Sequence, residues 1–164
     1  MGTHASDRTD VGQVLRAAKE RFALDLRGVH GIRHWTRVRE NGHRLARHTG
    51  ANKIVVELFA VLHDCCREND RHDLGHGERA AIFAETLRGT LLHLSDADFA
   101  LLFEAIRDHE HGRTRADVTV MTCWDADRLD LGRVRVRPNP QYLCTEFARR
   151  KPTIEWAYGR SLED

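Results

Sequence analysis

The chain has 164 residues, a length typical of one domain and sufficient for a core without disulfides or structural zinc. Its formal net charge is +1, so it has neither the basic excess of a nucleic-acid-binding protein nor the acidic excess of a solvating tail. No apolar run approaches the ~18 residues of a membrane span, and residues 1–7 lack the apolar stretch of a secretory signal. The four cysteines therefore favour reduced thiols and a cytoplasmic location.

The first two predicted helices follow from apolar side chains that recur at helical spacing. An amphipathic stripe predicts a helix over 11–26, capped at its start by Asp7 or Asp10. A second helix is predicted over 31–49. Gly50 follows it, and a glycine at that position commonly ends a helix.

The most apolar helix of the chain is predicted next. Asn52 is a suitable N-terminal cap, and residues 54–62 are almost entirely apolar. A helix of this composition belongs in a core, and we expect it to carry His63 and Asp64 into that core. The polar stretch 67–73 that follows is predicted to be a loop.

Three further helices are predicted, over 76–87, 95–109 and 118–131. Ser95 is the expected cap of the second of these, and Asp98 occupies the capping-box position three residues later.

The end of the chain gives a weaker signal. Pro138 and Pro140 break the chain, and we expect only a short segment at 142–149 and a tail around Trp156. Residues 134–137 alternate as a strand does, but one short strand cannot form a sheet. The sequence therefore predicts an all-α fold.

Six side chains are predicted to reach a shared interior from five different helices. Buried ionisable groups cost several kcal/mol unless they are paired, hydrogen-bonded or ligated. A single histidine on an apolar stripe is usually a hydrogen-bonded core residue, but six such residues together favour a metal site. Imidazole and carboxylate ligands suit divalent Mn, Fe, Co, Ni or Zn, and Mg is also allowed. The six residues are His34, His63, Asp64, His76, His109 and Asp125.

The order of these residues resembles the HD-domain metal-dependent phosphohydrolase superfamily, in particular its small bacterial hydrolases. The signature of that superfamily is a histidine, a His-Asp doublet and a distant aspartate, matched here by His34, by His63 with Asp64, and by Asp125. The resemblance covers about residues 28–132 and implies that these four side chains bind the main metal ion. It also implies a helical bundle.

Two more features of the chain are similar to small HD hydrolases: residues 76–81, and residues 125–130 preceded by residues 106–109. They contain His76 and His109, at positions that bind a second metal in some HD proteins and contact phosphate in others. The resemblance therefore implies one or two ions. The predicted architecture is a single HD-type domain over 11–164 with roughly six to eight helices, preceded by a flexible segment at 1–10.

The mechanism that we expect is attack of a metal-bound hydroxide on phosphorus. Asp64 is the expected ligand that orients the hydroxide, while His76 or His109 is a candidate proton donor to the leaving group. Arg67 and Arg128 are candidate substrate-binding residues, because a guanidinium can stabilise the growing charge on phosphate oxygens. A solvated loop position for Arg67 and a structural ion pair for Arg128 are the alternatives.

The function that the resemblance implies is hydrolysis of a phosphate ester or anhydride of a small metabolite, with a nucleotide favoured as the substrate. One alternative is a di-iron HD-type oxygenase, since the six-residue set allows two irons. The other is a non-catalytic or regulatory HD module with a structural metal. We expect no membrane or nucleic-acid partner, and a homodimer is left open.

Overall fold

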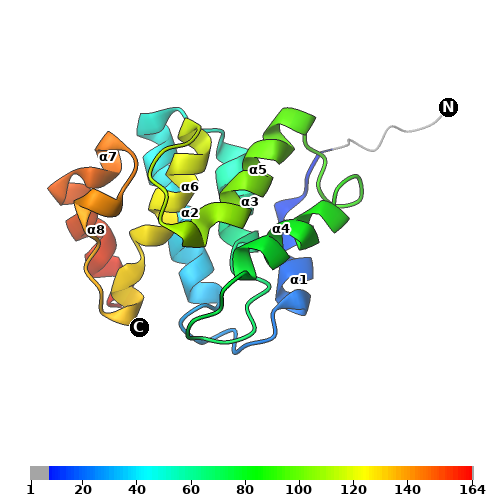
Figure 1. The fold of residues 1–164 in the computed structure, drawn as a ribbon, viewed down its shortest axis with the longest axis horizontal. Coiled ribbons are helices and arrows are strands. Elements are labelled where there is room, and N and C mark those ends of the chain that lie inside the picture. The colour runs from blue at the N-terminus through cyan, green and yellow to red at the C-terminus, as the bar shows by residue number, and fades with distance from the viewer. Residues whose placement is uncertain (1–7, 164) are drawn as a thin grey trace.

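The computed structural model describes residues 8–163, which form α-helices and short 3-10 helices with no β-strand (Figure 1). This confirms the all-α prediction. None of the helices in this part of the chain combines the length and the apolar character needed to span a membrane. The α-helices are α1 (Val11–Arg21), α2 (Ile32–Thr49), α3 (Lys53–Leu62), α4 (His76–Thr86), α5 (Asp96–Asp108), α6 (Val118–Arg128), α7 (Glu146–Arg149) and α8 (Lys151–Ser161). The 3-10 helices are η1 (His109–His111), η2 (Leu131–Val134) and η3 (Pro140–Tyr142).

Local signals set the ends of several helices. The side chains of Asp10, Asn52 and Ser95 accept hydrogen bonds from the first backbone N–H groups of α1, α3 and α5. Gly50 adopts the left-handed conformation and ends α2. The other suggested cap of α1, Asp7, lies outside the described residues, as does most of the segment predicted to be flexible.

The structure corrects three predictions about the helices, two of them on where a helix ends. Helix α1 ends at Arg21 instead of near residue 26, because Phe22 turns to an extended conformation with ψ of 120°. Helix α3 ends at Leu62, so His63 caps it and Asp64 lies in the turn that follows. The tail around Trp156 is a regular helix, α8.

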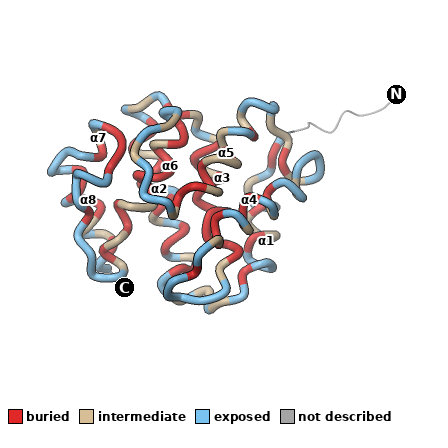
Figure 2. The backbone as a smooth tube through the Cα atoms, in the orientation of Figure 1, coloured by how far each residue is buried: buried red, intermediate tan, exposed pale blue. Residues whose placement is uncertain are grey.

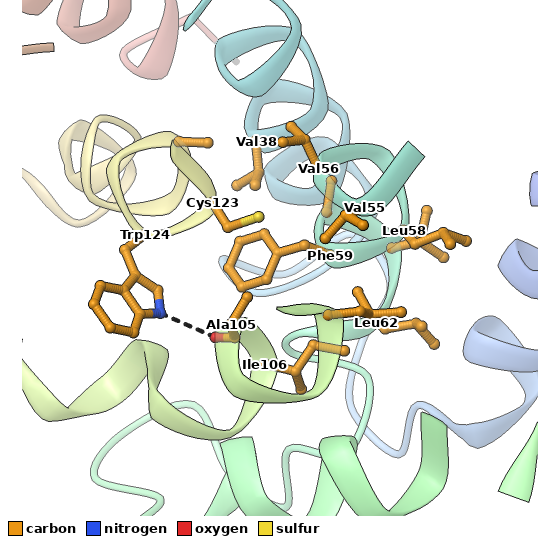
Figure 3. Packing of buried hydrophobic residues seen from close by; sticks show 14 of the residues in the cluster. Val38, Val55, Val56, Leu58, Phe59, Leu62, Ala105, Ile106, Cys123 and Trp124 are labelled. Carbon is orange, nitrogen blue, oxygen red and sulfur yellow. Dashed lines mark hydrogen bonds between the residues drawn. The ribbon is translucent and has the colours of Figure 1, made fainter. Parts of the chain in front are cut away.

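The core lies between α2, α3, α5 and α6, at the centre of the molecule in Figure 1. Figure 3 shows Phe59 of α3 among side chains of the neighbouring helices. The indole Nε1 of Trp124 donates a hydrogen bond of 3.1 Å to the carbonyl of Ala105, which ties α6 to α5. Burial follows the inward faces of these helices (Figure 2), while α1 and the α7–α8 pair lie at opposite ends of the molecule.

A glycine brings α2 and α3 close together. A Cβ atom at Gly42 would lie 2.4 Å from Cγ1 of Val56, so only glycine allows this approach. The same two helices carry His34, inside α2, and His63, at the end of α3. Close packing of the helices therefore helps to bring the two imidazoles together.

Candidate metal centre

Four side chains meet at a buried point between α2, α3 and α6, and we call them group one. The Nε2 atoms of His34 and His63 are 3.0 Å apart. Oδ1 of Asp127 lies 3.3 Å from the first of these nitrogens and 3.7 Å from the second. Oδ2 of Asp64 lies 3.5 Å and 3.7 Å from the same two nitrogens. Four potential ligand atoms thus surround one small space.

Hydrogen bonds at the other ring nitrogen orient both imidazoles of group one. Nδ1 of His63 faces the carbonyl of Phe59 at 3.1 Å, and a carbonyl can only accept, so this nitrogen carries the proton. Nδ1 of His34 faces Oδ2 of Asp130 at 2.7 Å, and Arg37 donates to the other oxygen of that carboxylate at 2.6 Å. With the ring proton on Nδ1, the Nε2 atom of each imidazole carries no proton, and its lone pair points at the other ring.

A second cluster, group two, lies on the other side of Asp64. The Nε2 atoms of His76 and His109 are 2.8 Å apart. Oδ1 of Asp64 lies 3.2 Å from His76 Nε2 and 3.6 Å from His109 Nε2. Asp64 therefore gives one carboxylate oxygen to each group, and its position in the turn after α3 is what allows this.

The imidazoles of group two are oriented in the same way as those of group one. Nδ1 of His109 donates to the carbonyl of Ile106 at 2.7 Å. Nδ1 of His76 faces the carbonyl of Asp73 at 2.6 Å and Oε2 of Glu110 at 2.7 Å. Again two unprotonated Nε2 atoms face one another.

This donor arrangement fits divalent metal ions. The lone pairs of two Nε2 atoms about 3 Å apart repel one another unless a cation lies beside them. Each group also contains at least one carboxylate oxygen. Ligand atoms at ~2.1 Å from one ion are roughly 3.0–3.4 Å from one another, close to the separations seen here. The mixture of imidazole and carboxylate suits first-row divalent ions. Each histidine also has a hydrogen-bonded Nδ1, as metal-binding histidines usually do.

The protonation equilibria of His63, Asp64 and Asp127 agree with this reading. Burial lowers the pKa of His63 to about 3, so this imidazole is neutral and able to bind a metal at neutral pH. Burial alone would raise the pKa of Asp64, but the neighbouring imidazoles of His63, His109 and His30 hold that pKa well below its usual value. The pKa of Asp127 is also held well below its usual value, because the contact with the His34 imidazole outweighs burial.

Comparison with known proteins supports the same assignment. A solved structure, the crystal structure of a predicted HD superfamily hydrolase from an uncultured Thermotogales bacterium, matches with a TM-score of 0.73 and 29% sequence identity. The match covers 92% of this chain and 86% of that chain. The chain has the HD-domain fold. This confirms the resemblance seen in the motif blocks. No protein-family model matches the chain, and the search of curated proteins gave no match.

The structure does not place the predicted last aspartate of the HD motif in either group. Asp125 lies on the other side of α6, where its oxygens accept hydrogen bonds from the backbone N–H groups of Cys144 at 2.6 Å and Thr145 at 2.8 Å. The hydroxyl of Thr145 donates a third bond at 2.7 Å. Asp125 therefore holds the C-terminal segment against α6, and Asp127 takes its place among the candidate ligands.

Sequence reasoning missed Asp127, although a signal was present. Positions 120, 123 and 127 repeat at intervals of three and four residues, which places Asp127 on the same face of α6 as Val120 and Cys123. Sequence reasoning also missed His30, whose Nδ1 lies 3.0 Å from Asp64 Oδ2, and Asp130, which orients His34.

The two arginines predicted to bind substrate have different positions in the HD domain. Nε of Arg67 donates to Oδ1 of Asp64 at 3.1 Å, so this guanidinium lies beside the candidate metal centre. Nη1 of Arg128 donates to the carbonyl of Tyr142 at 2.8 Å and contacts Sγ of Cys144 at 3.4 Å. Arg128 thus fastens the C-terminal segment through a carbonyl and a thiol, not through the ion pair of the alternative, and the structure does not bring it to the site.

Proposed function

We propose that the protein is a metal-dependent phosphohydrolase that acts on a small phosphorylated compound, with a nucleotide favoured. The observation that carries this proposal is the pair of imidazole groups on either side of Asp64, inside an HD-type helical fold. The solved neighbour is described as a predicted HD superfamily hydrolase, which supports the reaction class. The phosphate substrate and the cytoplasmic location remain predictions from the sequence, and a homodimer remains open.

A divalent ion held by these residues would act as a Lewis acid towards a phosphoryl oxygen and lower the pKa of water at the site. The chain supplies the rest. Asp64 is fixed from two sides, by His30 at 3.0 Å and by Arg67 at 3.1 Å, so its carboxylate cannot rotate freely. Nη1 of Arg67 donates to the carbonyls of Asn69 and Arg71, so Nη2 is left to offer N–H groups and positive charge to an anionic substrate.

The imidazoles of group two have two uses in this proposal. With two ions bound, His76 and His109 are ligands of the second. With a single ion in group one, the facing nitrogens share a proton, and the nearby Asp64 carboxylate raises the pKa of His109 although burial opposes it. In that state His109 holds a proton that it can donate to a leaving group.

The test is elemental analysis of the purified protein, followed by a panel of nucleotides, phosphate esters and anhydrides with Mn²⁺, Co²⁺, Ni²⁺, Fe²⁺ and Mg²⁺. Asp64→Ala removes an oxygen from both groups, and we expect it to reduce phosphatase activity to background. The exposed Asp70→Ala is the matched control, because only its backbone carbonyl makes a contact near the site, with His30. Circular dichroism should show the same helical content in both variants. Wild-type activity in Asp64→Ala would exclude the proposed site.

A second candidate is favoured by group two. Because Asp64 gives an oxygen to each group, the site can accept two ions, as a di-iron oxygenase of the HD type requires. This alternative predicts two irons per chain and oxygen uptake with a suitable substrate. A regulatory module with a structural metal predicts bound metal without turnover on either panel.

A further inference from the structure

A third arginine lies at the edge of group one. Nε of Arg133 donates to the carbonyl of Val29 at 3.0 Å, and Nη1 donates to the carbonyl of Asp130 at 3.0 Å. These two bonds come from separate parts of the chain and fix the plane of the guanidinium. The remaining nitrogen, Nη2, lies 4.0 Å from Oδ1 of Asp127, beyond hydrogen-bond distance.

Exposure shows the side from which a ligand can reach group one. The side chains of His34 and His63 have 0% exposure and that of Asp64 has 3%, whereas Asp127 has 17%. Solvent therefore reaches these ligands at Asp127. Arg133 is 9% exposed and stands next to that carboxylate, so a molecule that approaches group one passes its Nη2.

A guanidinium in this position needs an anion. Two backbone carbonyls carry only partial charge. Within residues 8–163, the one carboxylate within 4.0 Å of Arg133 is that of Asp127, which also faces the imidazoles of His34 and His63. Once that carboxylate binds a metal ion, less of its negative charge is left to balance Arg133. The planar donor groups of arginine match the oxygens of phosphate.

We propose that Arg133 binds the terminal phosphate of the substrate and selects phosphomonoester dianions over diester monoanions. This inference rests on the proposed phosphohydrolase function. It assigns to Arg133 the role that the sequence suggested for Arg128. The two backbone bonds hold the guanidinium in place before substrate arrives, which reduces the entropy lost on binding.

The test compares Arg133→Gln with Arg135→Gln. Both changes remove one positive charge from the same segment, but Arg135 is exposed and makes no hydrogen bond or ion pair through its side chain with the described residues. The first measurement is calorimetric titration of the metal-loaded protein with inorganic phosphate. The second is the KM and kcat for p-nitrophenyl phosphate and for bis(p-nitrophenyl) phosphate. Metal content and thermal midpoint are measured for each variant.

In Arg133→Gln we expect phosphate affinity to fall about tenfold or more, the loss typical of a charge-assisted hydrogen bond. KM for the monoester should rise by a similar factor, with a smaller change in kcat and a smaller change for the diester. Arg135→Gln should stay within about twofold of wild type. Metal content should be equal in both variants.

Suppose that the wild type hydrolyses phosphate esters, but Arg133→Gln and Arg135→Gln have the same phosphate affinity and the same KM. This result would overturn the role of Arg133 and leave the proposed function standing. A wild type that neither binds phosphate nor hydrolyses either ester would overturn the proposed function as well.

If Arg133→Gln fails to fold or loses metal, the variant Arg133→Lys tests the inference instead. It keeps the charge but not the planar donor group, so phosphate affinity should fall about three- to tenfold. Wild-type affinity in Arg133→Lys would overturn the inference.

Discussion

Two aspartates on one turn of α6 have different partners. The carboxylate of Asp127 faces two imidazole nitrogens, while that of Asp125 accepts three hydrogen bonds from Cys144 and Thr145. Burial raises the pKa of the Asp125 carboxyl despite these bonds, whereas the contact with the His34 imidazole lowers that of Asp127 although burial opposes it. One residue is placed to bind a cation, and the other to hold a segment of chain.

Replacing each aspartate by asparagine separates these roles. Asp127→Asn removes an anionic ligand, and we expect the metal content and phosphatase activity to fall by a factor of about ten or more. Asp125→Asn places an amide nitrogen against backbone donors, and we expect a loss of about 1–3 kcal/mol in the free energy of unfolding with the metal retained. Elemental analysis and denaturant unfolding measure the two effects. The reverse pattern would restore Asp125 as the ligand.

The sequence alone predicted a metal site and most of its candidate ligands, but it assigned Asp125 instead of Asp127 as the last ligand. His34, His63 and Asp64 stand out because they interrupt or end strongly apolar stripes. Asp125 and Asp127 are only two residues apart on a helix, about 200° around its axis, so both belong to a buried helix but to opposite faces. Which face turns towards the histidines depends on the rotation of α6 in the bundle, and packing against several helices sets that rotation.

At the scale of elements, one close contact builds group two. A Cβ atom at Gly77 would lie 2.8 Å from the carbonyl oxygens of Ile106 and Arg107. Both obstacles are backbone atoms, which cannot move aside as a side chain can. Glycine at this position therefore lets the start of α4 approach the end of α5, so that His76 and His109 meet.

We expect Gly77→Ala to push α4 away from α5 and separate these two imidazoles. A protein that binds two ions should then retain the one in group one and lose the other. Elemental analysis of the loaded variant measures this stoichiometry. The control is Gly159→Ala in α8, where a Cβ atom meets nothing within 4 Å and alanine should add up to ~1 kcal/mol of stability. Equal metal content in Gly77→Ala and wild type would show that group two tolerates the shift.

The elements with capping residues and continuous apolar stripes were predictable, and the C-terminal helix was not. Helix α8 has only a few buried positions, Thr153, Ile154, Ala157 and Ser161, and two of them are polar. Its amphipathic pattern is therefore faint. It packs beside η2 and α7, and those contacts stabilise a helix that hydrophobic periodicity did not reveal.

For the whole molecule, the candidate ligands lie on five separate parts of the fold. They belong to α2, the end of α3 with the turn after it, α4, η1 and α6. Ions bound in group one and group two join elements that are far apart in the chain, and the unfolded chain cannot hold them in this way.

Removal of the metal should therefore destabilise the entire domain. At a free ion concentration ~100 times the Kd, binding adds about 2.7 kcal/mol to the free energy of unfolding. A chelator should then lower the thermal midpoint by about 5–10 °C, as measured by calorimetry, and readdition of the ion should restore it. Asp127→Asn should show a smaller drop. An identical midpoint with and without chelator, in protein shown to contain metal, would contradict a link between the ion and the fold.

The position of Asp64 has one more consequence. Its two oxygens face different clusters, so a cation that enters one cluster withdraws electron density from the donor offered to the other and adds electrostatic repulsion. Uptake should therefore occur in two steps of unequal strength. Protein expressed in medium with little metal would contain mostly molecules with one bound ion. The second group would then be open to an ion of a different metal.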